Sequence, residues 1–491
     1  MSAKVTVFCA ALLAATAARA ATYTVTNLND LGSGSLRAAV ASANSNSGAD
    51  TIVFQTGLTG TITLTTGELD VTDSVTITGP GSASLTVSGN DQSRIFLFNQ
   101  YGSSHTHTVS GLTLTHGRPF DSGGGILSSG DTLTLSDVRI TYCVAGGDGG
   151  GLAFYGPGSL SITNSVFSNN SAENASSCWE FGDVNGGRGG GVYADEASSV
   201  SITSSTFSSN GARADGGGLG IVGANSSATS VSITSSSFTS NTADVLGCDP
   251  KSGGGIYYGG LGNDDTLTID DSTIADNLAN GGNAGGLLLG DLDTITMRRS
   301  TVSGNNASGG YGGGMVLSYN EVTVLENVTI STNTAATNGG SLAVTAPSYS
   351  TTLRHTTVTG NGGGTNGGIY ASGGTVVTLR NSIAANSVNT TSSTACDDLK
   401  NDGTSSFNVT YTLVEQPGVS TITSGGGNIL NTDPQLGTLL NNGGTTLTHR
   451  PGCCAPVLNA GDPAFSSPPS TDQRLGARVV GGRIDMGSVE R

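Results

Sequence analysis

The pattern of apolar and polar positions repeats along most of the chain. The segments SVSITSSTFSSN (residues 199–210) and SVSITSSSFTSN (230–241) are nearly identical, and both end in asparagine. Their apolar residues alternate with polar ones at period two, which is typical of a strand with one buried face. Aligning the chain on the final asparagine gives one column, and every member follows an apolar residue three positions earlier. Its members are Gly117, Cys143, Asn170, Asn210, Asn241, Asn277, Asn305, Asn333, Asn361 and Asn386.

The spacing of this column predicts the fold. Successive members are 25 to 40 residues apart, and most are followed by a glycine run and another apolar residue. Repeats of this length, built from short strands and glycine-rich corners, are typical of a solenoid in which each repeat is one turn. We therefore predict an all-β fold, a single-stranded right-handed parallel β-helix of the pectate-lyase-like type. The asparagines should stack at one corner, about 4.8 Å apart, with their amides bonded to one another.

The two ends of the chain depart from the repeat. Residues 35–44, SLRAAVASAN, predict a short helix with Ser33 or Ser35 as its N-cap. Such a helix should cover the open end of the stack and its unpaired strand edges. We divide the rest of the mature chain into an N-terminal cap with opening coils (21–106), β-helix repeats (107–395) and a C-terminal cap folded back on the last turns (396–491). The apolar face of the predicted helix consists of Leu36, Ala39, Val40 and Ala43.

The first 20 residues predict export. They contain one early lysine, an apolar run and a small-residue end at positions 18–20. This arrangement is typical of a cleaved secretory signal peptide and is too short for a membrane span. No later stretch approaches the roughly 18 apolar residues that a transmembrane helix needs. We therefore expect an extracellular or bacterial cell-surface protein without a transmembrane segment.

Charge narrows the choice of partners. After removal of the signal peptide, 17 basic and 36 acidic residues remain, a net charge of −19, and the only lysines are Lys251 and Lys400. This excess of acid disfavours nucleic acid and anionic membranes as partners, and acidic polymers as substrates. The 77 glycines and the low share of charged residues, 11%, are common in disordered chains, but regular apolar positions are not. The sequence leaves the oligomeric state open.

Three segments resemble a known group of exported bacterial proteins. NDLGSGSLRAAVASANSNSGADTIVF (29–54) resembles the N-terminal segment of β-helix surface proteins related to polymorphic outer membrane proteins and to those with the CSLREA motif. DPQLGTLLNNGG (433–444) and DQRLGARVVGGRIDMGSVE (472–490) are similar to the choice-of-anchor Q region that ends such chains. The resemblance implies a bacterial, exported β-helix repeat protein, and it implies no particular reaction.

Two insertions interrupt the regular spacing. The distance from the asparagine column to the next glycine corner is 8 to 10 residues in most repeats, but 22 from Asn170 to Val192 and 15 from Asn241 to Ile256. Both insertions, within 171–191 and 242–255, leave the same edge of the stack, where loops on a rigid scaffold often bind ligands. Trp179 either stacks on a sugar or packs on its own loop. The candidate ligand-binding residues in these loops are Trp179, Glu180, Asp183, Asp249 and Lys251.

One column of charges offers a catalytic interpretation. Asp148, Arg188 and Asp215 precede the glycine corners of three successive repeats. If they stack, the two carboxylates lie about 9 to 10 Å apart, near the upper end of the range for inverting glycosidases. The alternative is a salt-bridge ladder in which both acids share Arg188. A second column of alternating charge, expected only to fix strand register, favours that alternative. It consists of Asp270, Arg298, Glu326 and Arg354.

Metal and cofactor sites have little support in the sequence. The five histidines are dispersed, and no His/Cys spacing is typical of zinc. Pairs of aspartates offer only a weak indication of calcium, because none follows the glycine-aspartate pattern of calcium-binding repeats. We therefore expect no cofactor and no metal. The aspartate pairs are Asp264 with Asp265, Asp270 with Asp271, and Asp397 with Asp398.

Six cysteines remain after signal cleavage, an even number that suits an oxidising compartment. Cys178 and Cys248 lie on the two insertions, where a disulfide would tie the loops together. Cys396 is a candidate partner for the adjacent pair Cys453 and Cys454. Cys143 stands in the asparagine column, either as a buried free thiol or as the partner of Cys178.

These observations favour a secreted or surface-associated β-helix that acts as an adhesin-like binding or structural module toward glycans or cell surfaces. The alternative is a polysaccharide lyase or glycoside hydrolase acting in the flank formed by loops 171–191 and 242–255. A lyase commonly needs a lysine or arginine base and charge neutralisation of an acidic sugar. Because lysine is scarce and acid abundant, the sequence favours a protein without catalytic activity while leaving the question open.

Overall fold

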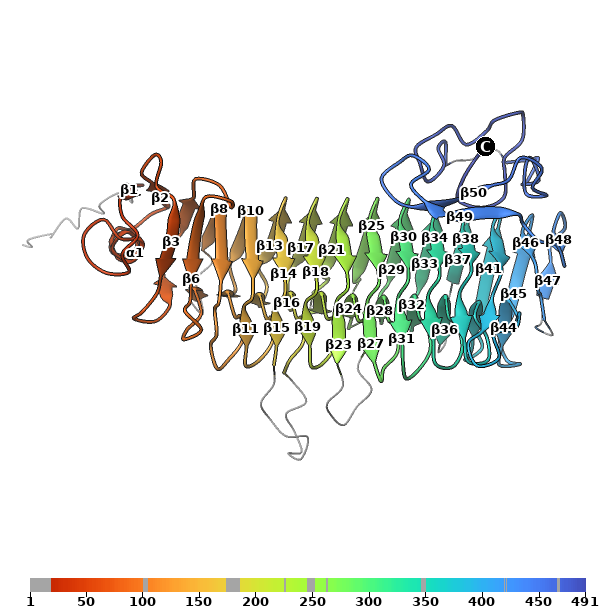
Figure 1. Ribbon diagram of the computed structural model, residues 1–491, viewed down its shortest axis with the longest axis horizontal. Coiled ribbons are helices and arrows are strands. Elements are labelled where there is room, and N and C mark those ends of the chain that lie inside the picture. The colour runs from red at the N-terminus through yellow and green to blue at the C-terminus, as the bar shows by residue number, and fades with distance from the viewer. Residues whose placement is uncertain are drawn as a thin grey trace, which may run out of the picture.

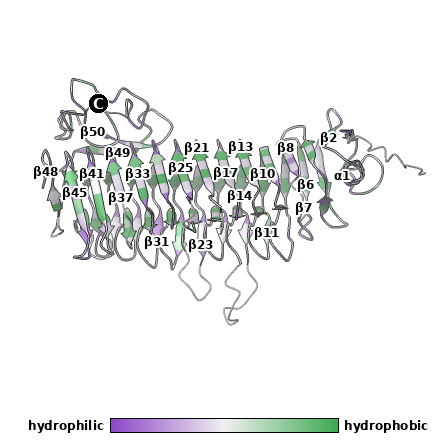
Figure 2. Ribbon diagram, turned by 180° about the vertical axis from the view of Figure 1, so that it is seen from behind, coloured by the Kyte–Doolittle hydropathy of each residue, from purple (hydrophilic) through white to green (hydrophobic). Residues whose placement is uncertain are grey.

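The computed structural model describes residues 19–99, 105–173, 186–224, 227–244, 252–261, 264–345, 350–418, 420, 422–465 and 469–491. These residues form a long rod of parallel strands with one helix at its N-terminal end (Figure 1). Three parallel sheets of 27, 12 and 9 strands run along the rod, and the prediction of a parallel β-helix is confirmed. Figure 2 shows the rod from behind, with apolar residues following its strands. In the part of the chain that the structure describes, no helix is long and apolar enough to cross a membrane.

Most turns of the solenoid contribute strands to all three sheets. The 12-stranded sheet contains β4 (Leu69–Val71), β7 (Phe96–Asn99), β9 (Ile126–Ser129), β12 (Leu152–Tyr155), β16 (Val192–Asp195), β20 (Leu219–Val222), β24 (Ile256–Gly259), β28 (Leu287–Gly290), β32 (Met315–Ser318), β36 (Leu342–Thr345), β40 (Ile369–Ala371) and β44 (Leu399–Asn401). The nine-stranded sheet contains β11 (Val144–Ala145), β15 (Ser171–Ala172), β19 (Gly211–Ala212), β23 (Thr242–Asp244), β27 (Leu278–Asn280), β31 (Asn306–Ala307), β35 (Thr334–Ala335), β39 (Gly362–Gly363) and β43 (Val388–Asn389).

The 27-stranded sheet takes two strands from most turns, with a bend between them. Its strands are β1 (Thr22–Val25), β2 (Asp50–Phe54), β3 (Gly60–Thr63), β5 (Val75–Thr78), β6 (Leu85–Ser88), β8 (Thr106–Thr115), β10 (Thr132–Thr141), β13 (Ser159–Thr163), β14 (Val166–Ser168), β17 (Ser199–Thr203), β18 (Thr206–Ser208), β21 (Ser230–Thr234), β22 (Ser237–Thr239), β25 (Thr266–Asp270), β26 (Thr273–Ala275), β29 (Thr294–Arg298), β30 (Thr301–Ser303), β33 (Val322–Glu326), β34 (Thr329–Ser331), β37 (Ser350–Arg354), β38 (Thr357–Thr359), β41 (Val376–Arg380), β42 (Ile383–Ala385), β45 (Ser406–Thr410), β46 (Leu413–Val414), β47 (Ile422–Ser424) and β48 (Ile429–Leu430).

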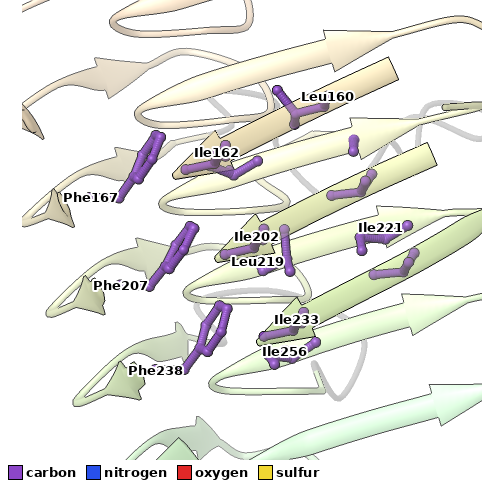
Figure 3. Close-up of a cluster of buried hydrophobic side chains, with 14 of the residues drawn as sticks. Leu160, Ile162, Phe167, Ile202, Phe207, Leu219, Ile221, Ile233, Phe238 and Ile256 are labelled. Carbon is purple, nitrogen blue, oxygen red and sulfur yellow. The ribbon is translucent and has the colours of Figure 1, made fainter. Parts of the chain in front are cut away.

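Identical sequence positions lie side by side in the stack. β17 pairs with β21 so that Val200 faces Val231 and Ile202 faces Ile233 along the two copies of SVSIT. The apolar residues of both strands point inward, as period-two alternation predicts. Phe167, Phe207 and Phe238 form a stack with ring centroids 5.0 and 4.5 Å apart, and all three are fully buried (Figure 3). The register follows from the sequence, because a slip of one residue would expose this whole set.

The asparagines form the predicted ladder at one corner. The Asn170 amide donates to the Asn210 side-chain oxygen at 3.0 Å, and Asn210 donates in the same way to Asn241 at 2.9 Å. The chain of bonds continues through Asn277, Asn305 and Asn333 to Asn361. Each side-chain oxygen also accepts a hydrogen bond from a main-chain N–H of the preceding turn. For example, the Asn210 main-chain N–H donates to the side-chain oxygen of Asn241. This ladder satisfies backbone groups that would otherwise be buried without partners.

Asn386 does not belong to the ladder, contrary to the alignment by residue type. Val358 pairs with Ala384 and Gly362 with Val388, so Ser387 is the residue beside Asn361. Asn386 is exposed and has φ +56°, like Tyr142 and the other residues that precede ladder positions. Asparagine tolerates this left-handed conformation better than most residues. The same residue type therefore suits two adjacent columns, which explains the error.

The N-terminal end carries the predicted helix. α1 (Leu36–Ser45) begins after Ser35, whose hydroxyl accepts the Ala38 N–H. The predicted apolar face of Leu36, Ala39, Val40 and Ala43 is buried against the first turns. The helix thus covers the apolar interior of the first coil (Figure 1).

The C-terminal end differs from the expected cap. Strands β44 to β48 still pair with preceding turns, so the stack continues to Leu430, past the predicted boundary at residue 395. Residues 436–491, which we call the C-terminal unit, include the antiparallel strands β49 (Leu436–Leu440) and β50 (Thr448–Pro451). This unit lies along the side of β30, β34, β38 and β42 and not over the end of the rod (Figure 1). Its hydrogen bonds include Thr329 with Gln473 at 2.7 Å and Ser331 with His449 at 2.8 Å.

Candidate functional site

The three predicted charged residues lie in one column at the corner that enters the 12-stranded sheet. The Gly149 N–H donates to the Arg188 carbonyl at 2.8 Å, and the Gly189 N–H donates to the Asp215 carbonyl at 3.0 Å. Asp148, Arg188 and Asp215 therefore occupy the same position on three successive turns of the stack. Gly189 has φ +63°, and a Cβ there would lie 2.3 Å from the Val192 carbonyl oxygen, so this corner requires glycine.

Asp148 fixes the main chain of the next turn. Its side chain is nearly buried, with the residue 7% exposed, and Oδ1 accepts the Arg188 N–H at 2.8 Å. Oδ2 lies 3.4 Å from Tyr155 Oη, which is 2.8 Å from Ser122 Oγ. Burial raises the pKa of Asp148, while the Arg188 N–H and guanidinium oppose that shift. The carboxylate therefore already serves as an acceptor inside the wall of the stack.

Asp215 has the same role one insertion later. Its Oδ1 accepts the Ser252 N–H at 2.9 Å. Arg188 and Ser252 stand where the two insertions rejoin the stack, directly before the glycine corners of β16 and β24. The two candidate acids thus occupy equivalent positions, and each holds the returning end of one insertion.

Arg188 contacts Asp148 through its main-chain N–H, while its guanidinium lies beside the Tyr193 hydroxyl. Its Nη1 lies 3.5 Å from Tyr193 Oη, and its buried Nε has no hydrogen-bond partner among the described residues. Burial lowers the pKa of Arg188, but the Tyr193 hydroxyl and the charge of Asp215 outweigh it and leave the pKa raised. With Asp148 the contact runs through the main chain instead. On the Asp148 side a main-chain hydrogen bond thus accompanies the charge of the guanidinium, and the shared ladder stays a prediction.

Three tyrosines complete the site, which we call the flank cluster: Asp148, Tyr155, Arg188, Tyr193, Asp215 and Tyr257. Tyr193 and Tyr257 occupy the same outward-facing position of β16 and β24, two turns apart. The Tyr155 and Tyr193 rings meet edge to face with centroids 5.8 Å apart, and Tyr193 is only 2% exposed. Burial raises the pKa of all three phenols, so they remain protonated donors at neutral pH.

These tyrosines were not predicted from the sequence, because they lie on the strands after the glycine corners and not in the charged column. Each tyrosine points outward, at the second or fourth position of the strand that follows a glycine corner. Tyrosine at outward positions of one sheet, within the turns that carry insertions, is a signal that the alignment already contained. Tyrosine combines an apolar ring with a polar tip and suits such half-buried walls.

The second charged column behaves as expected of a structural ladder. Arg298 lies 3.9 Å from Asp270, and Arg354 pairs with Glu326. Arg299 adds a close contact to Asp271 at 2.8 Å. Direct ion pairs thus hold this face, whereas the flank cluster is held by main-chain donors and phenols.

The insertions themselves begin after β15 and β23. Glu173, the last described residue before the first insertion, lies 3.7 Å from Arg118. The predicted binding residues and the proposed loop disulfide lie outside the described residues and stay predictions. They are Trp179, Glu180, Asp183, Asp249 and Lys251 for binding, and Cys178 with Cys248 for the disulfide.

The remaining cysteines and aspartate pairs have other roles. Cys143, Cys396, Cys453 and Cys454 are unbridged, so the predicted disulfide between Cys396 and the adjacent pair is not formed. The Cys396 sulfur instead accepts the Gly367 N–H at 3.1 Å. Burial raises the pKa of the Cys143 thiol to about 12, as expected for the free buried alternative.

Of the aspartates weighed as calcium ligands, several are already bonded to main-chain N–H groups. Asp265 accepts from Thr229 and Leu261, and Asp398 accepts from Ser387 and Gln416. Among the described residues, no group of three or more His, Cys, Asp or Glu side chains is placed to hold a metal ion.

Comparison with known proteins supports the fold. A family model described as "Right handed beta helix region" matches residues 73–264. None of the curated proteins compared with the chain matches it. The resemblances to polymorphic outer membrane proteins, to CSLREA-type N-termini and to the choice-of-anchor Q region receive no support from this match and stay predictions.

Solved structures with a similar course of chain include two modules from Azotobacter vinelandii. The mannuronan C-5 epimerase AlgE4 A-module is 15% identical, with a TM-score of 0.44, and the alignment covers 82% of this chain and 98% of the module. The AlgE6 A-module is 14% identical, with a TM-score of 0.42 and coverages of 84% and 100%. Tailspike protein 3 of bacteriophage CBA120 is 10% identical, with a TM-score of 0.38 and coverages of 81% and 56%.

Proposed function

We propose that the protein is an exported, surface-associated β-helix that binds glycans or other cell-surface material through its two insertions and catalyses no reaction. One observation carries the proposal. Asp148 and Asp215, the best candidates for catalytic acids, are each bonded to the main-chain N–H at which an insertion rejoins the stack. A general acid must reach the substrate with a free oxygen, and these carboxylates are instead used to position loops.

Anchored loops suit a binding role. A loop fixed at its root by a rigid sheet loses less conformational freedom when it binds, and more of the contact energy remains as affinity. The two insertions are the longest in the repeat region and contain the only tryptophan of the chain, Trp179. A tryptophan and several polar side chains on adjacent loops suit a ligand with both apolar faces and hydroxyl groups, as sugars have.

Charge selects among glycans. The chain has a formal net charge of −17, and the flank cluster contains two acids and one arginine. Anionic polysaccharides would be repelled by this surface, particularly at low ionic strength. We therefore expect neutral or amino-sugar glycans as ligands.

Affinity electrophoresis and glycan arrays test the proposal with the purified full-length protein. We expect retention by neutral or amino-sugar polymers, and Trp179→Ala should weaken binding by about tenfold. Tyr319→Ala serves as the control, because Tyr319 is exposed on a corner without an insertion. Absence of binding across the panel, or equal effects of the two substitutions, would contradict the proposal.

A second candidate function, a polysaccharide lyase or glycoside hydrolase, is favoured by one feature. Asp148 has a raised pKa and a phenol within 3.4 Å, and perturbed acids beside a hydrogen-bond partner are common in active sites. Reducing-sugar and unsaturated-product assays on a polysaccharide panel decide the question. Turnover that disappears in both Asp148→Asn and Asp215→Asn would replace the binding proposal by the enzymatic one.

A further inference from the structure

Cys453 and Cys454 form an exposed pair of thiols on the C-terminal unit. They occupy the middle of the turn 452–455, in which the Ala455 N–H donates to the Gly452 carbonyl at 3.3 Å. The turn directly follows β50, and both cysteines are exposed. Their sulfur atoms are 3.7 Å apart, so the turn directs the two side chains toward one another. A bond between them requires the sulfur atoms to approach to about 2.05 Å.

The two thiols act on one another and lie near a basic residue. The hydrogen bond and charge of Cys453 raise the pKa of Cys454, and the nearby Arg491 opposes that shift. Arg491 is held beside the turn, because its guanidinium donates to the Pro451 carbonyl at 2.7 Å. In the contact between the two sulfur atoms either one can be the donor, so whichever thiol ionises has the other thiol beside it. A thiolate beside a second thiol is the arrangement that thiol–disulfide exchange requires.

The other described cysteines lack these properties. Cys143 is fully buried in the ladder corner, and burial raises its pKa to about 12. Cys396 is partly buried, and its sulfur already accepts a main-chain N–H. Reaction with an external disulfide should therefore concentrate on the adjacent pair.

We propose that Cys453 and Cys454 are a redox-active dithiol whose reaction partner is a low-molecular-weight disulfide, such as glutathione disulfide. In the first step the thiolate of either cysteine attacks one sulfur of that disulfide, which releases one glutathione thiolate and leaves a mixed disulfide on that cysteine. In the second step the neighbouring cysteine loses its proton to solvent and attacks the protein sulfur of the mixed disulfide. This step releases the second glutathione and closes a bond between the adjacent residues. The protein loses two electrons, and the external disulfide gains them.

The product is a readily reversible bond and not a structural staple. Consecutive Cα atoms are about 3.8 Å apart, whereas ordinary disulfides join Cα atoms separated by roughly 4.4 to 6.8 Å. The closed ring must therefore distort the turn, and strained, exposed disulfides are the ones that are easily reduced. The turn leads directly to Ala455 and Val457, which are buried against the stack beside Ile383. Oxidation would thus act on the part of the C-terminal unit that packs against β42.

Redox titration of the full-length protein tests this proposal independently of glycan binding. The protein is equilibrated in glutathione buffers of increasing oxidised fraction, the remaining thiols are alkylated, and the peptide containing both cysteines is analysed by mass spectrometry. We expect the mass of that peptide to fall by two hydrogens, with no glutathione attached to it, and to return to its original value after treatment with dithiothreitol. Cys143 should resist oxidation in the folded protein.

Matched variants test the two-step course of the reaction. Cys454→Ser should keep one glutathione on Cys453, because no second thiol resolves the mixed disulfide. Cys453→Ser should keep one glutathione on Cys454 for the same reason. Cys396→Ser should leave the titration unchanged. The proposal is overturned if the wild-type protein keeps both thiols reduced in the most oxidising buffer, carries glutathione on both residues, or forms disulfide-linked dimers through them.

Discussion

Substitution of Asp148 distinguishes an anchoring carboxylate from a catalytic one. Its Oδ1 accepts the Arg188 N–H at 2.8 Å, at the point where the first insertion rejoins the stack. Alanine removes this acceptor and leaves the N–H to find water. Asparagine keeps an oxygen at the same position and removes only the acid. Asp148→Ala and Asp148→Asn should therefore differ strongly if the residue is an anchor.

The expected size of the effect follows from the hydrogen bond. A bond to a charged acceptor contributes about 1.5 to 3 kcal/mol. Part of this is offset, because burial disfavours the carboxylate that alanine also removes. We expect residues 186–190 to lose about 2 kcal/mol of local stability in Asp148→Ala, which corresponds to about 30-fold faster exchange of their amides. Asp148→Asn should lose no more than about 1 kcal/mol, or about fivefold.

Hydrogen exchange followed by mass spectrometry measures this directly on the peptide that covers residues 186–192. Asp215→Ala is the matched control: it should accelerate exchange at Ser252, whose N–H it releases, and leave residues 186–192 unchanged. The melting temperature of the whole protein should change little, because the bond holds only the returning end of one insertion. Unchanged exchange in Asp148→Ala would refute the anchoring role, and equal effects of alanine and asparagine would point to the acid itself.

Three further predictions concern stability. Asn241→Ala breaks the side-chain bonds to Asn210 and Asn277 and should lower the free energy of unfolding in urea by about 3 to 5 kcal/mol. Asn386→Ala, outside the ladder, should lower it by about 1 kcal/mol, and equal losses would contradict the placement of Asn386 outside the ladder. Burial raises the pKa of Glu490 from 4.5 to about 7. The protonated side chain therefore stabilises the C-terminal unit below pH 4.5, and this contribution is lost as pH rises through 7. Relative to Glu490→Gln, the melting temperature of the wild-type protein should fall between pH 5 and 8. The Gln473 amide donates to Thr301 at 3.0 Å and to Thr446 at 2.9 Å, and its oxygen accepts from Thr329. Gln473→Ala should therefore weaken the attachment of the C-terminal unit by about 2 to 4 kcal/mol, measured as faster proteolysis at residues 436–491. An unchanged cleavage rate would show that other contacts hold the unit.

The repeat made the stack predictable because each turn contacts only its neighbours. The alignment alone placed Phe167 beside Phe207 and Asn210 beside Asn241, and the structure has both contacts. It failed at Asn386, where residue type and strand register disagree. Local pattern also fails where the contact is distant in sequence: Thr329 meets Gln473 across 144 residues, and nothing in the repeat marks it. The role of Asp148 was hidden for a different reason, since its partner is a main-chain N–H that every residue type offers.

The position of the C-terminal unit has a consequence for how the rod comes apart. A solenoid with a bare end can fray one turn at a time, because each turn is held only by the one before it. Here the unit is bonded at once to β30, β34 and β38, and packs beside Ile383 of β42. These turns can therefore separate only after the unit has detached, and they should open together. The C-terminal unit therefore makes the unfolding of these turns cooperative instead of gradual.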